Sequence, residues 1–229
     1  MTSILSWRHS GNSHTQQTSR LRANQAGLSV VELLIVVIII LILSAWAIPS
    51  LLNSINTAHL RGAASDYSGL LEDARISAVK DNTFYATYIL PPATGTVEGN
   101  AYVDMPPKNN GAAVQVGDPT VTISSDVVLK PQGSAPNTSN LQSQLYPSTT
   151  VVPPTDTSVT PATFGPRGLP CTPLTLTGTT SIVCDTSGGP TAFWTFLQNS
   201  KTGAWQAVTI TPAGRIKKWF YNGTAWGKL

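Results

Sequence analysis

The sequence predicts an α+β protein in which a long N-terminal helix, with a transmembrane first half, packs on a β-rich antiparallel head. Two features of the sequence lead to this prediction. Residues 33–52 form an uncharged apolar run, and the region after residue 81 consists of short strand-like runs separated by Pro, Gly and Asn. Charged residues make up 11% of the chain and apolar residues 41%, which is too weakly charged for a typical cytosolic enzyme.

The apolar run from Leu33 to Leu52 is 20 residues long, the length that crosses a bilayer core of ~30 Å. A buried core helix is the alternative, but this run is apolar on every side. It also follows a leader that contains Arg8, Arg20 and Arg22 and no acid. Because positive charge is retained on the cytoplasmic side, we expect a single-pass inner-membrane protein with a cytoplasmic N-terminus.

The helical period continues beyond the apolar run as far as Lys80, where Lys80-Asp81-Asn82 supplies a stop. We therefore expect one helix over residues 28–80. Residues 28–52 would be its transmembrane or filament-core half, and residues 53–80 an amphipathic half. Pro49 removes one helical hydrogen bond, so we expect the helix to kink or open locally there. The expected apolar face comprises Leu52, Ile55, His59, Leu60, Ala63, Tyr67, Leu70, Leu71, Ala74 and Ala78.

Residues 81–229 are expected to form the β-rich head. The strand-like runs cover residues 83–90, 112–116, 120–123, 127–130, 181–184, 191–197, 204–211 and 215–221. Pro212-Ala213-Gly214 is typical of a hairpin turn between the last two. Residues from about 131 to 170 are rich in Pro, Ser and Thr, and we expect a loop or insertion there.

Composition argues against a catalytic or metal site. The three histidines are His9, His14 and His59, so the C-terminal region lacks the commonest general base and metal ligand. The two cysteines are too few for a zinc site made of Cys and His. We expect no catalytic residues, no metal and no cofactor, and an enzyme is the weakest of three functional hypotheses.

The residues around the start of the apolar run carry a recognisable pattern. Gly27 is followed by Leu28, Glu32 stands five places after Gly27, and Pro49 stands twenty-two places after it. The segment Gly27–Val36 resembles the class III signal of type IV pilins and type II secretion pseudopilins, although most relatives have Phe where this chain has Leu28. The resemblance implies that a prepilin peptidase cuts after Gly27, removing residues 1–27 as a cytoplasmic leader, and that the new amine of Leu28 is methylated.

Two other interpretations compete with this one. Residues 45–47 have the A-x-A form of a secretory cleavage site, but an acid directly before the apolar core is unusual for such a signal. A plain uncleaved anchor would require Gly27, Glu32 and Pro49 to coincide by chance. We favour the prepilin interpretation. Glu32 of a neighbouring subunit would then neutralise the Leu28 amine, so we expect Glu32 and Pro49 to act in assembly with other pilin or pseudopilin subunits.

Two cysteines lie in the part of the head expected outside the inner membrane. Cys171 and Cys184 bracket a turn, and the compartment is oxidising if the cell is Gram-negative. Two buried free thiols are the alternative. We prefer a disulfide, which would contribute ~3 kcal/mol in the chain-entropy model.

Two elements of the head indicate a particular group within this family. An element Phe164-Gly165-Pro166-Arg167-Gly168 precedes the cysteines, and the last long hairpin, Trp205–Trp219, carries Gly214-Arg215. This pattern resembles the pseudopilin H / FimT group. The resemblance implies a minor pseudopilin of a type II secretion filament, our first choice, with a head that lies in the periplasm or in an extracellular filament. The alternative is a FimT-like minor type IV pilin that binds DNA during natural transformation.

The DNA-binding hypothesis depends on the residues of the last predicted strand. The DNA-binding relatives carry G-R-x-R in this hairpin, and here Lys217 replaces the second Arg. Lys218 is expected on one face of the strand, and the other face is expected to carry Arg215, Lys217, Trp219 and Tyr221. Basic side chains beside aromatic rings suit a phosphate backbone and stacked bases. The alternative is a solvated edge strand that its charges protect from aggregation.

Overall fold

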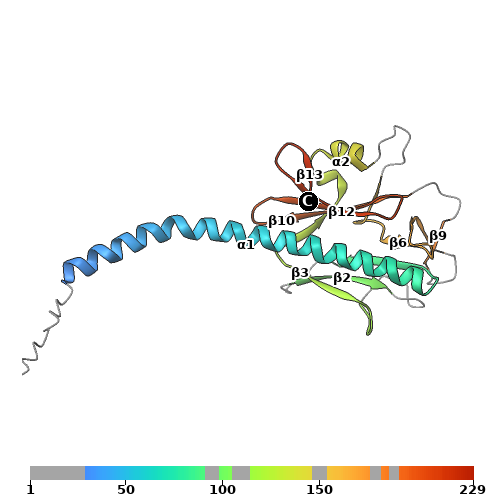
Figure 1. Ribbon diagram of the computed structural model, residues 1–229, viewed down its shortest axis with the longest axis horizontal. Helices are drawn as coiled ribbons and strands as arrows, with labels where there is room; N and C mark the ends of the chain where they lie inside the picture. The colour runs from blue at the N-terminus through green and yellow to red at the C-terminus, as the bar shows by residue number, and fades with distance from the viewer. Residues whose placement is uncertain (1–28, 91–97, 105–113, 146–153, 176–181, 186–190) are drawn as a thin grey trace, which may run out of the picture. The chain divides into compact units, whose positions relative to one another are not determined.

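The computed structural model describes residues 29–90, 98–104, 114–145, 154–175, 182–185 and 191–229 (Figure 1). Its contacts divide the chain into two units, Met1–Trp46 and Ala47–Leu229. In the first unit the described residues belong to the start of one helix, and the second unit holds the rest of that helix together with the head.

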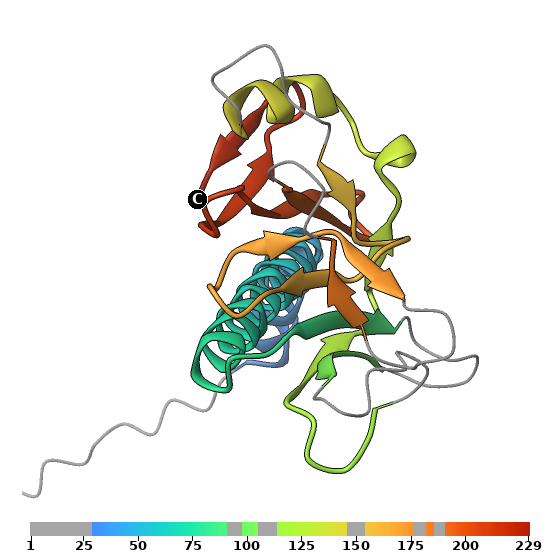
Figure 2. The ribbon, with the colours of Figure 1, turned by 90° about the vertical axis from the view of Figure 1, so that its right-hand side faces the viewer.

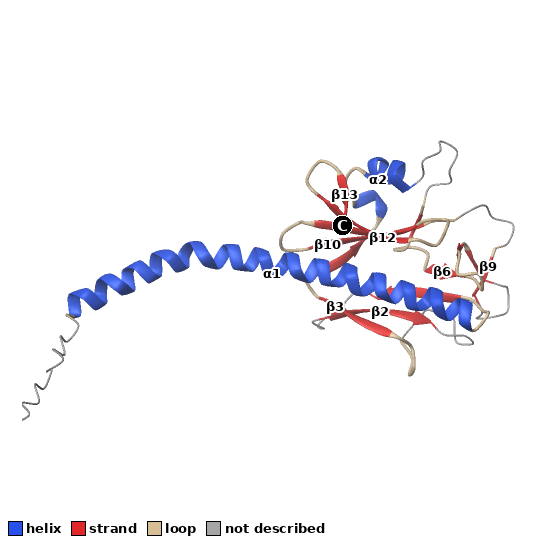
Figure 3. Ribbon diagram, viewed as in Figure 1, coloured by secondary structure: helices blue, strands red, loops and turns tan. Residues whose placement is uncertain are grey.

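Helix α1 runs without interruption from Val30 to Lys80, as Figure 3 shows. One long helix was predicted and is confirmed, although it begins two residues later than expected. The chain stays helical through Pro49, so the helix does not open there, and the kink at Pro49 stays a prediction. Within the described residues, α1 is the one helix long and apolar enough to cross a membrane by length and composition.

Two main antiparallel sheets make up the head. The first has the strand order β3-β2-β1-β6-β7 and the second the order β13-β12-β11-β10-β4. Strand β5 adds to β10 in parallel, and β8 and β9 form a separate pair. The predicted α+β class with an antiparallel head is therefore confirmed, with β5 as the exception. The strand bounds are β1 Tyr85–Leu90, β2 Glu98–Asp104, β3 Thr120–Ser124, β4 Val127–Lys130, β5 Thr155–Asp156, β6 Ala162–Phe164, β7 Pro170–Cys171, β8 Pro173–Thr175, β9 Ile182–Cys184, β10 Phe193–Asn199, β11 Trp205–Ile210, β12 Ile216–Tyr221 and β13 Trp226–Lys228.

One face of α1 is buried against both main sheets. Figure 2 looks along this part of the helix, with the red C-terminal strands on one side and green strands β1 and β2 on the other. Burial begins at Leu60, so Leu52 and Ile55, expected on this face, are 54% and 42% exposed. Tyr67 is fully enclosed, and burial raises the pKa of its hydroxyl to about 12. The buried helix residues are Leu60, Ala63, Ala64, Tyr67, Leu70, Leu71, Ala74 and Ala78.

The predicted loop over residues 131–170 is wrong for the part that the structure describes. This region contains a short 3-10 helix η1 Gln132–Ser134, helix α2 Thr138–Leu145 and the strands β5, β6 and β7. Helix α2 buries Leu141 and Leu145, which stand one turn apart, against an aromatic cluster on the outer face of the second sheet. Strand β6 is fully buried in the first sheet, where it pairs with β1. A few apolar residues at the right spacing are sufficient to form α2 and β6, because neighbouring strands bury these residues.

The remaining predicted strands are confirmed within one or two residues, with one error. Residues 112 and 113 lie outside the described part of the chain. Residues Val114–Val116 do not form a strand but enter a turn, in which the backbone N–H of Gln115 donates to Asp118 at 2.8 Å. Strands β2, β8 and β13 were not predicted.

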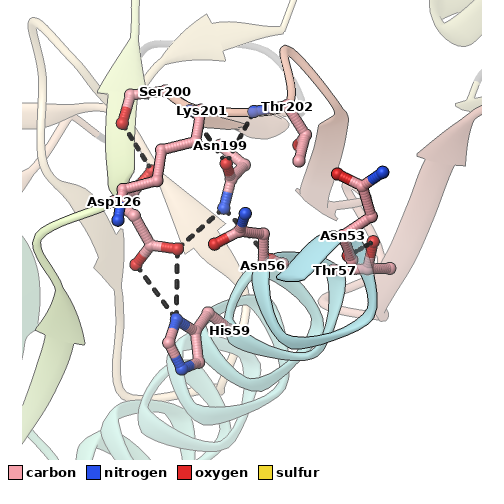
Figure 4. Close-up of polar contacts among 9 residues, drawn as sticks. All are labelled: Asn53, Asn56, Thr57, His59, Asp126, Asn199, Ser200, Lys201 and Thr202. Atoms are coloured by element: carbon pink, nitrogen blue, oxygen red, sulfur yellow. Dashed lines mark hydrogen bonds and ion pairs between the residues drawn. The ribbon is translucent and has the colours of Figure 1, made fainter. Parts of the chain in front are cut away.

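A polar cluster joins α1 to two turns of the head (Figure 4). The carboxylate of Asp126, between β3 and β4, is 4% exposed. It contacts His59 Nδ1 at 3.1 Å and accepts a hydrogen bond from Asn199 Nδ2 at 2.8 Å. Burial would raise the pKa of Asp126, but hydrogen bonds from Ser124, His59 and Asn199 outweigh it and lower the pKa below its usual 3.8.

From the lowered pKa of Asp126 we predict how the stability of the folded protein changes in acid. The folded state favours the ionised carboxylate, so its stabilisation is present above pH 3.8 and is lost as pH falls through the lower folded pKa. We expect Asp126→Asn to remove this component. Thermal unfolding of the full chain in detergent, followed by circular dichroism between about pH 6 and about pH 2.5, should show a smaller loss of Tm in the variant. The exposed Asp66→Asn control should keep the wild-type loss, and equal losses in all three proteins would contradict the assignment.

Candidate functional site

The basic residues near the C-terminus gather around a groove beside helix α1. The groove has a volume of about 540 Å³ and lies between α1 and strands β12 and β13. Five basic residues line it, against one acidic residue, Glu72. The lining residues are Ser68, Glu72, Arg75, Arg215, Ile216, Lys217, Lys218, Lys228 and Leu229.

The lysines of β12 point to opposite faces of the second sheet, as the strand period predicts. Lys218 faces α1, where its Nζ donates to Ser65 Oγ at 3.2 Å. Lys217 pairs in register with Thr209 of β11 and holds its ammonium 5.9 Å from the centre of the Trp219 ring. Arg215 and Lys228 are exposed, so these two cations are the most accessible to a ligand.

Trp219 does not offer the stacking surface that the sequence predicted. Its side chain is 3% exposed and packs with Trp194, Phe196 and Trp226 beneath α2. The indole N–H donates to Thr209 Oγ1 at 2.8 Å, so its polar atom is also satisfied inside the protein. Trp219 is therefore a core residue, and its ring offers no stacking surface to a ligand.

Arg75 explains why the two glycine-containing motifs of the head lie together. Its Nε donates to the carbonyl oxygen of Gly168 at 3.1 Å, and its Nη1 lies 3.4 Å from Glu72. Gly214 has φ +74, and a Cβ there would lie 2.8 Å from the Gly168 carbonyl oxygen and 3.4 Å from Arg75 Nε. Gly168 has φ +69, and a Cβ there would meet Val79 at 2.9 Å. Both motifs are thus turns that close around an α1 side chain.

Three of the five basic residues of the groove, Arg215, Lys217 and Lys218, were predicted from the last long hairpin. The predicted turn at Pro212–Gly214 is confirmed by the bond from Gly214 N to Thr211 O at 2.8 Å. Arg75 and Lys228 were not assigned to the site, because each comes from another element. The signal available for Arg75 was its place one turn after Glu72 on the polar side of the helix.

The structure pairs Cys171 with Cys184, as predicted. The bond joins the end of β7 to β9 across 13 positions of sequence, with the Cα atoms 5.4 Å apart, within the usual range for a disulfide. Gly165 lies beside it, since a Cβ there would come within 3.2 Å of Cys184 Sγ. The disulfide therefore stabilises the Phe164–Gly168 turn that receives Arg75.

The expected processing residues Gly27 and Leu28 lie outside the described residues. Glu32 lies in the first turn of α1, where a carboxylate is favoured by the helix dipole. Pro49 lies within the helix. Large apolar side chains from Val30 to Trp46 are 46–83% exposed, so this stretch of the isolated chain presents an unburied apolar surface.

Among the residues that the structure describes, no group of three or more His, Cys, Asp or Glu side chains is placed to hold a metal ion.

Comparisons with known proteins found little. No family model matches the chain, and no curated protein matches it. Among solved structures, the crystal structure of the type IV minor pilin FimU of Pseudomonas aeruginosa strain PAO1 is similar, with 15% identity and a TM-score of 0.38. The match covers 70% of this chain and 87% of that one. A likeness of this size carries no argument about this chain, so the proposals below rest on its own residues.

From the crowding around Gly214 we predict that a side chain at this position lowers the free energy of unfolding. Gly214→Ala combines the cost of a left-handed backbone, about 1 kcal/mol, with an overpacking cost of about 1–2 kcal/mol against Gly168 and Arg75. The matched control is Gly203→Ala, since Gly203 has φ +71 but open space around its Cβ, and should lose only about 1 kcal/mol. Urea unfolding of the full chain in detergent measures both. Equal losses would show that the Arg75 junction tolerates a methyl group.

Proposed function

We propose that the chain is a minor pseudopilin of the pseudopilin H type, a structural subunit of a type II protein secretion filament. One observation carries the proposal: α1 has two parts of opposite character. Residues 33–46 expose an apolar surface interrupted by one polar side chain, Ser44, whereas residues 60–78 bury one face against the head.

An unburied apolar helix of this length requires a bilayer or neighbouring helices around it. A membrane before assembly and a filament core after it would provide both. With cleavage after Gly27, Glu32 would be the fifth residue of the chain that begins at Leu28, and two charges in an apolar setting favour the one register in which they pair. The head, stapled by Cys171–Cys184, suits an oxidising compartment outside the inner membrane.

Cleavage is tested at Gly27. A bulky Gly27→Leu should block a peptidase that requires a small residue before the cut, whereas Gly27→Ala is the control that keeps a small residue. Mass spectrometry of the membrane-bound product in the host should show the full 229-residue chain for Gly27→Leu and a methylated chain beginning at Leu28 for the wild type. An unprocessed wild-type chain would contradict the prepilin interpretation.

Assembly is tested at Glu32. Glu32→Val should be cleaved normally yet fail to enter filaments, because the Leu28 amine loses its partner. Filaments sheared from the host and probed with an antibody to the head would measure this. Secretion of folded proteins should fall to the level of the gene deletion, with DNA uptake unchanged. Wild-type incorporation of the variant would contradict the pairing, and loss of DNA uptake with normal secretion would favour a pilus.

The second candidate function is that of a FimT-like minor pilin that binds DNA, and the groove supports it. Arg75, Arg215, Lys218 and Lys228 converge there from three elements with one acid, Glu72, among them. Converging cations attract a phosphate backbone. Two observations count against DNA binding: Trp219 is buried, and Arg75 already donates a hydrogen bond to Gly168.

The DNA hypothesis is tested with Arg215→Ala/Lys228→Ala, which removes the two exposed cations of the groove. The matched control is Lys80→Ala/Lys201→Ala, which removes the same charge from exposed positions outside the groove. If DNA binds, affinity of the full chain in detergent should fall with salt, and the groove variant should reduce the slope of log K against log [salt] by about 1.4–1.8. If the two double variants showed the same DNA affinity and the same salt dependence, the groove cations would have no specific role in DNA binding.

A further inference from the structure

The groove carries positive charge that its own lining does not neutralise. Arg75 Nη1 lies 3.4 Å from a carboxylate oxygen of Glu72, so the one acidic residue of the lining is paired with one of the five basic residues. Among the described contacts, the other four basic residues form no ion pair. Two of them, Arg215 and Lys228, are exposed. The groove therefore fits an anionic partner from outside its own lining.

Two exposed carboxylates of the head form no ion pair or side-chain hydrogen bond among the described contacts. Both belong to α1, at Asp66 and Asp73. Beyond Trp46, one other acid with a described side chain is exposed, Asp81, and it accepts a hydrogen bond from Tyr85 Oη at 2.6 Å. Positions seven apart in an α-helix lie almost in line, ~10.5 Å apart along the axis. The two carboxylates therefore share one line of the helix surface.

Glycine alternates with aspartate along this line. Gly62 and Gly69 each precede one of the aspartates by four positions, and an added Cβ at either glycine would meet nothing within 4 Å. Glycine inside a helix destabilises it relative to alanine, and no close contact within the chain requires glycine at these two positions. A bare backbone beside each carboxylate lets a neighbouring molecule approach closely. We call the line formed by Gly62, Asp66, Gly69 and Asp73 the acidic stripe.

The acidic stripe and the groove lie on opposite flanks of α1. Ser68 and Arg75, which line the groove, each come two positions after an aspartate of the stripe. Two positions correspond to a rotation of about 200° around the helix, so a chain does not pair its own stripe with its own groove. Complementary surfaces on opposite flanks join copies head to tail, and such contacts extend into helical assemblies unless they close into a ring.

The charges on the two surfaces have similar spacing. Lys228 pairs in register with Trp219, which comes four residues after Arg215. Four residues of extended chain span ~13 Å, against ~10.5 Å between the two aspartates along the helix axis. The long, flexible side chains of Arg and Lys cover this difference. One surface can therefore engage both charges of the other at the same time.

We propose that the acidic stripe of one copy docks on the groove of a second copy, with Asp66 and Asp73 paired to the exposed cations Arg215 and Lys228. Ile76, which is 56% exposed and lies one turn beyond Asp73, is covered by the same contact. This inference rests on the proposed function, since subunits of a filament require a head-to-tail contact, and it names a second copy of the chain as the partner of the groove.

Charge reversal tests this contact. Sedimentation of the full chain in detergent is measured at low salt over a range of protein concentrations, because exposed ion pairs are weak and screened by salt. We expect the wild type to form assemblies of more than two copies, and salt to weaken them. Asp66→Lys/Asp73→Lys and Arg215→Glu/Lys228→Glu each bring like charges together, so each should raise the dissociation constant at least about tenfold.

A variant with all four substitutions exchanges the charges of the two surfaces and keeps the net charge of the wild type. It should regain the wild-type association. The control Lys201→Glu, at an exposed position outside both surfaces, should not change it. Association through the apolar part of α1 is common to all these proteins, so the differences between them report on the charged contact. An unchanged Tm shows that each variant folds.

Equal association of all the variants, or a fourfold variant that does not recover, overturns the proposal. So does loss of DNA binding in Arg215→Glu/Lys228→Glu with unchanged association, which would assign the groove to DNA. The assay requires neither cleavage after Gly27 nor a filament, so its failure is separate from failure of the proposed function.

Discussion

The buried face of helix α1 is the constraint on which the head depends. From Leu60 to Ala78 this face contacts both main sheets, including Tyr85 and Phe164 of the first and Phe193 and Val208 of the second. Four of its eight buried residues are alanines, and such small side chains let strands approach the helix closely. Neither sheet has another helix to cover it on this side among the described elements, so the two sheets share one core because they share one helix.

The turns of the head follow from this shared helix. Arg75 leaves the polar side of α1 and donates to the carbonyl of Gly168, and Gly214 lies against the same guanidinium. Glycine is required at both turns since each has a positive φ and too little room for a methyl group. The two glycines of the motifs that resemble the pseudopilin H / FimT group are thus explained by packing alone. This packing does not account for the exposed cations of the groove, Arg215 and Lys228.

Two kinds of contact attach the helix to the head, and they differ in their response to solvent. The apolar contacts from Leu60 onward depend on burial and are insensitive to pH. The contacts of His59 and Asn56 at the end of the packed segment are polar: His59 contacts the carboxylate of Asp126, and the Asn56 carbonyl oxygen accepts from Asn199. Because this end has no buried apolar residue, we expect it to have a lower local stability than the buried face.

The sequence by itself determined the elements whose signal is local. The long helix α1, most of the strands of the two main sheets and the turn at Pro212–Gly214 were predicted, because periodicity and turn residues act over a few positions. The pairing of Cys171 with Cys184 was predicted because the chain has two cysteines and because we expected an oxidising compartment. Tertiary structure decided the rest. Strand β6 and helix α2 lie in the region predicted as a loop, and each is stable only because distant strands complete its burial. Trp219 was assigned to a ligand surface but is covered by α2, which strand alternation cannot foresee. Arg75 and Lys228 join the groove, and Asn199 reaches the backbone of α1 from 143 positions away, since proximity between remote residues is a property of packing and not of spacing in the chain.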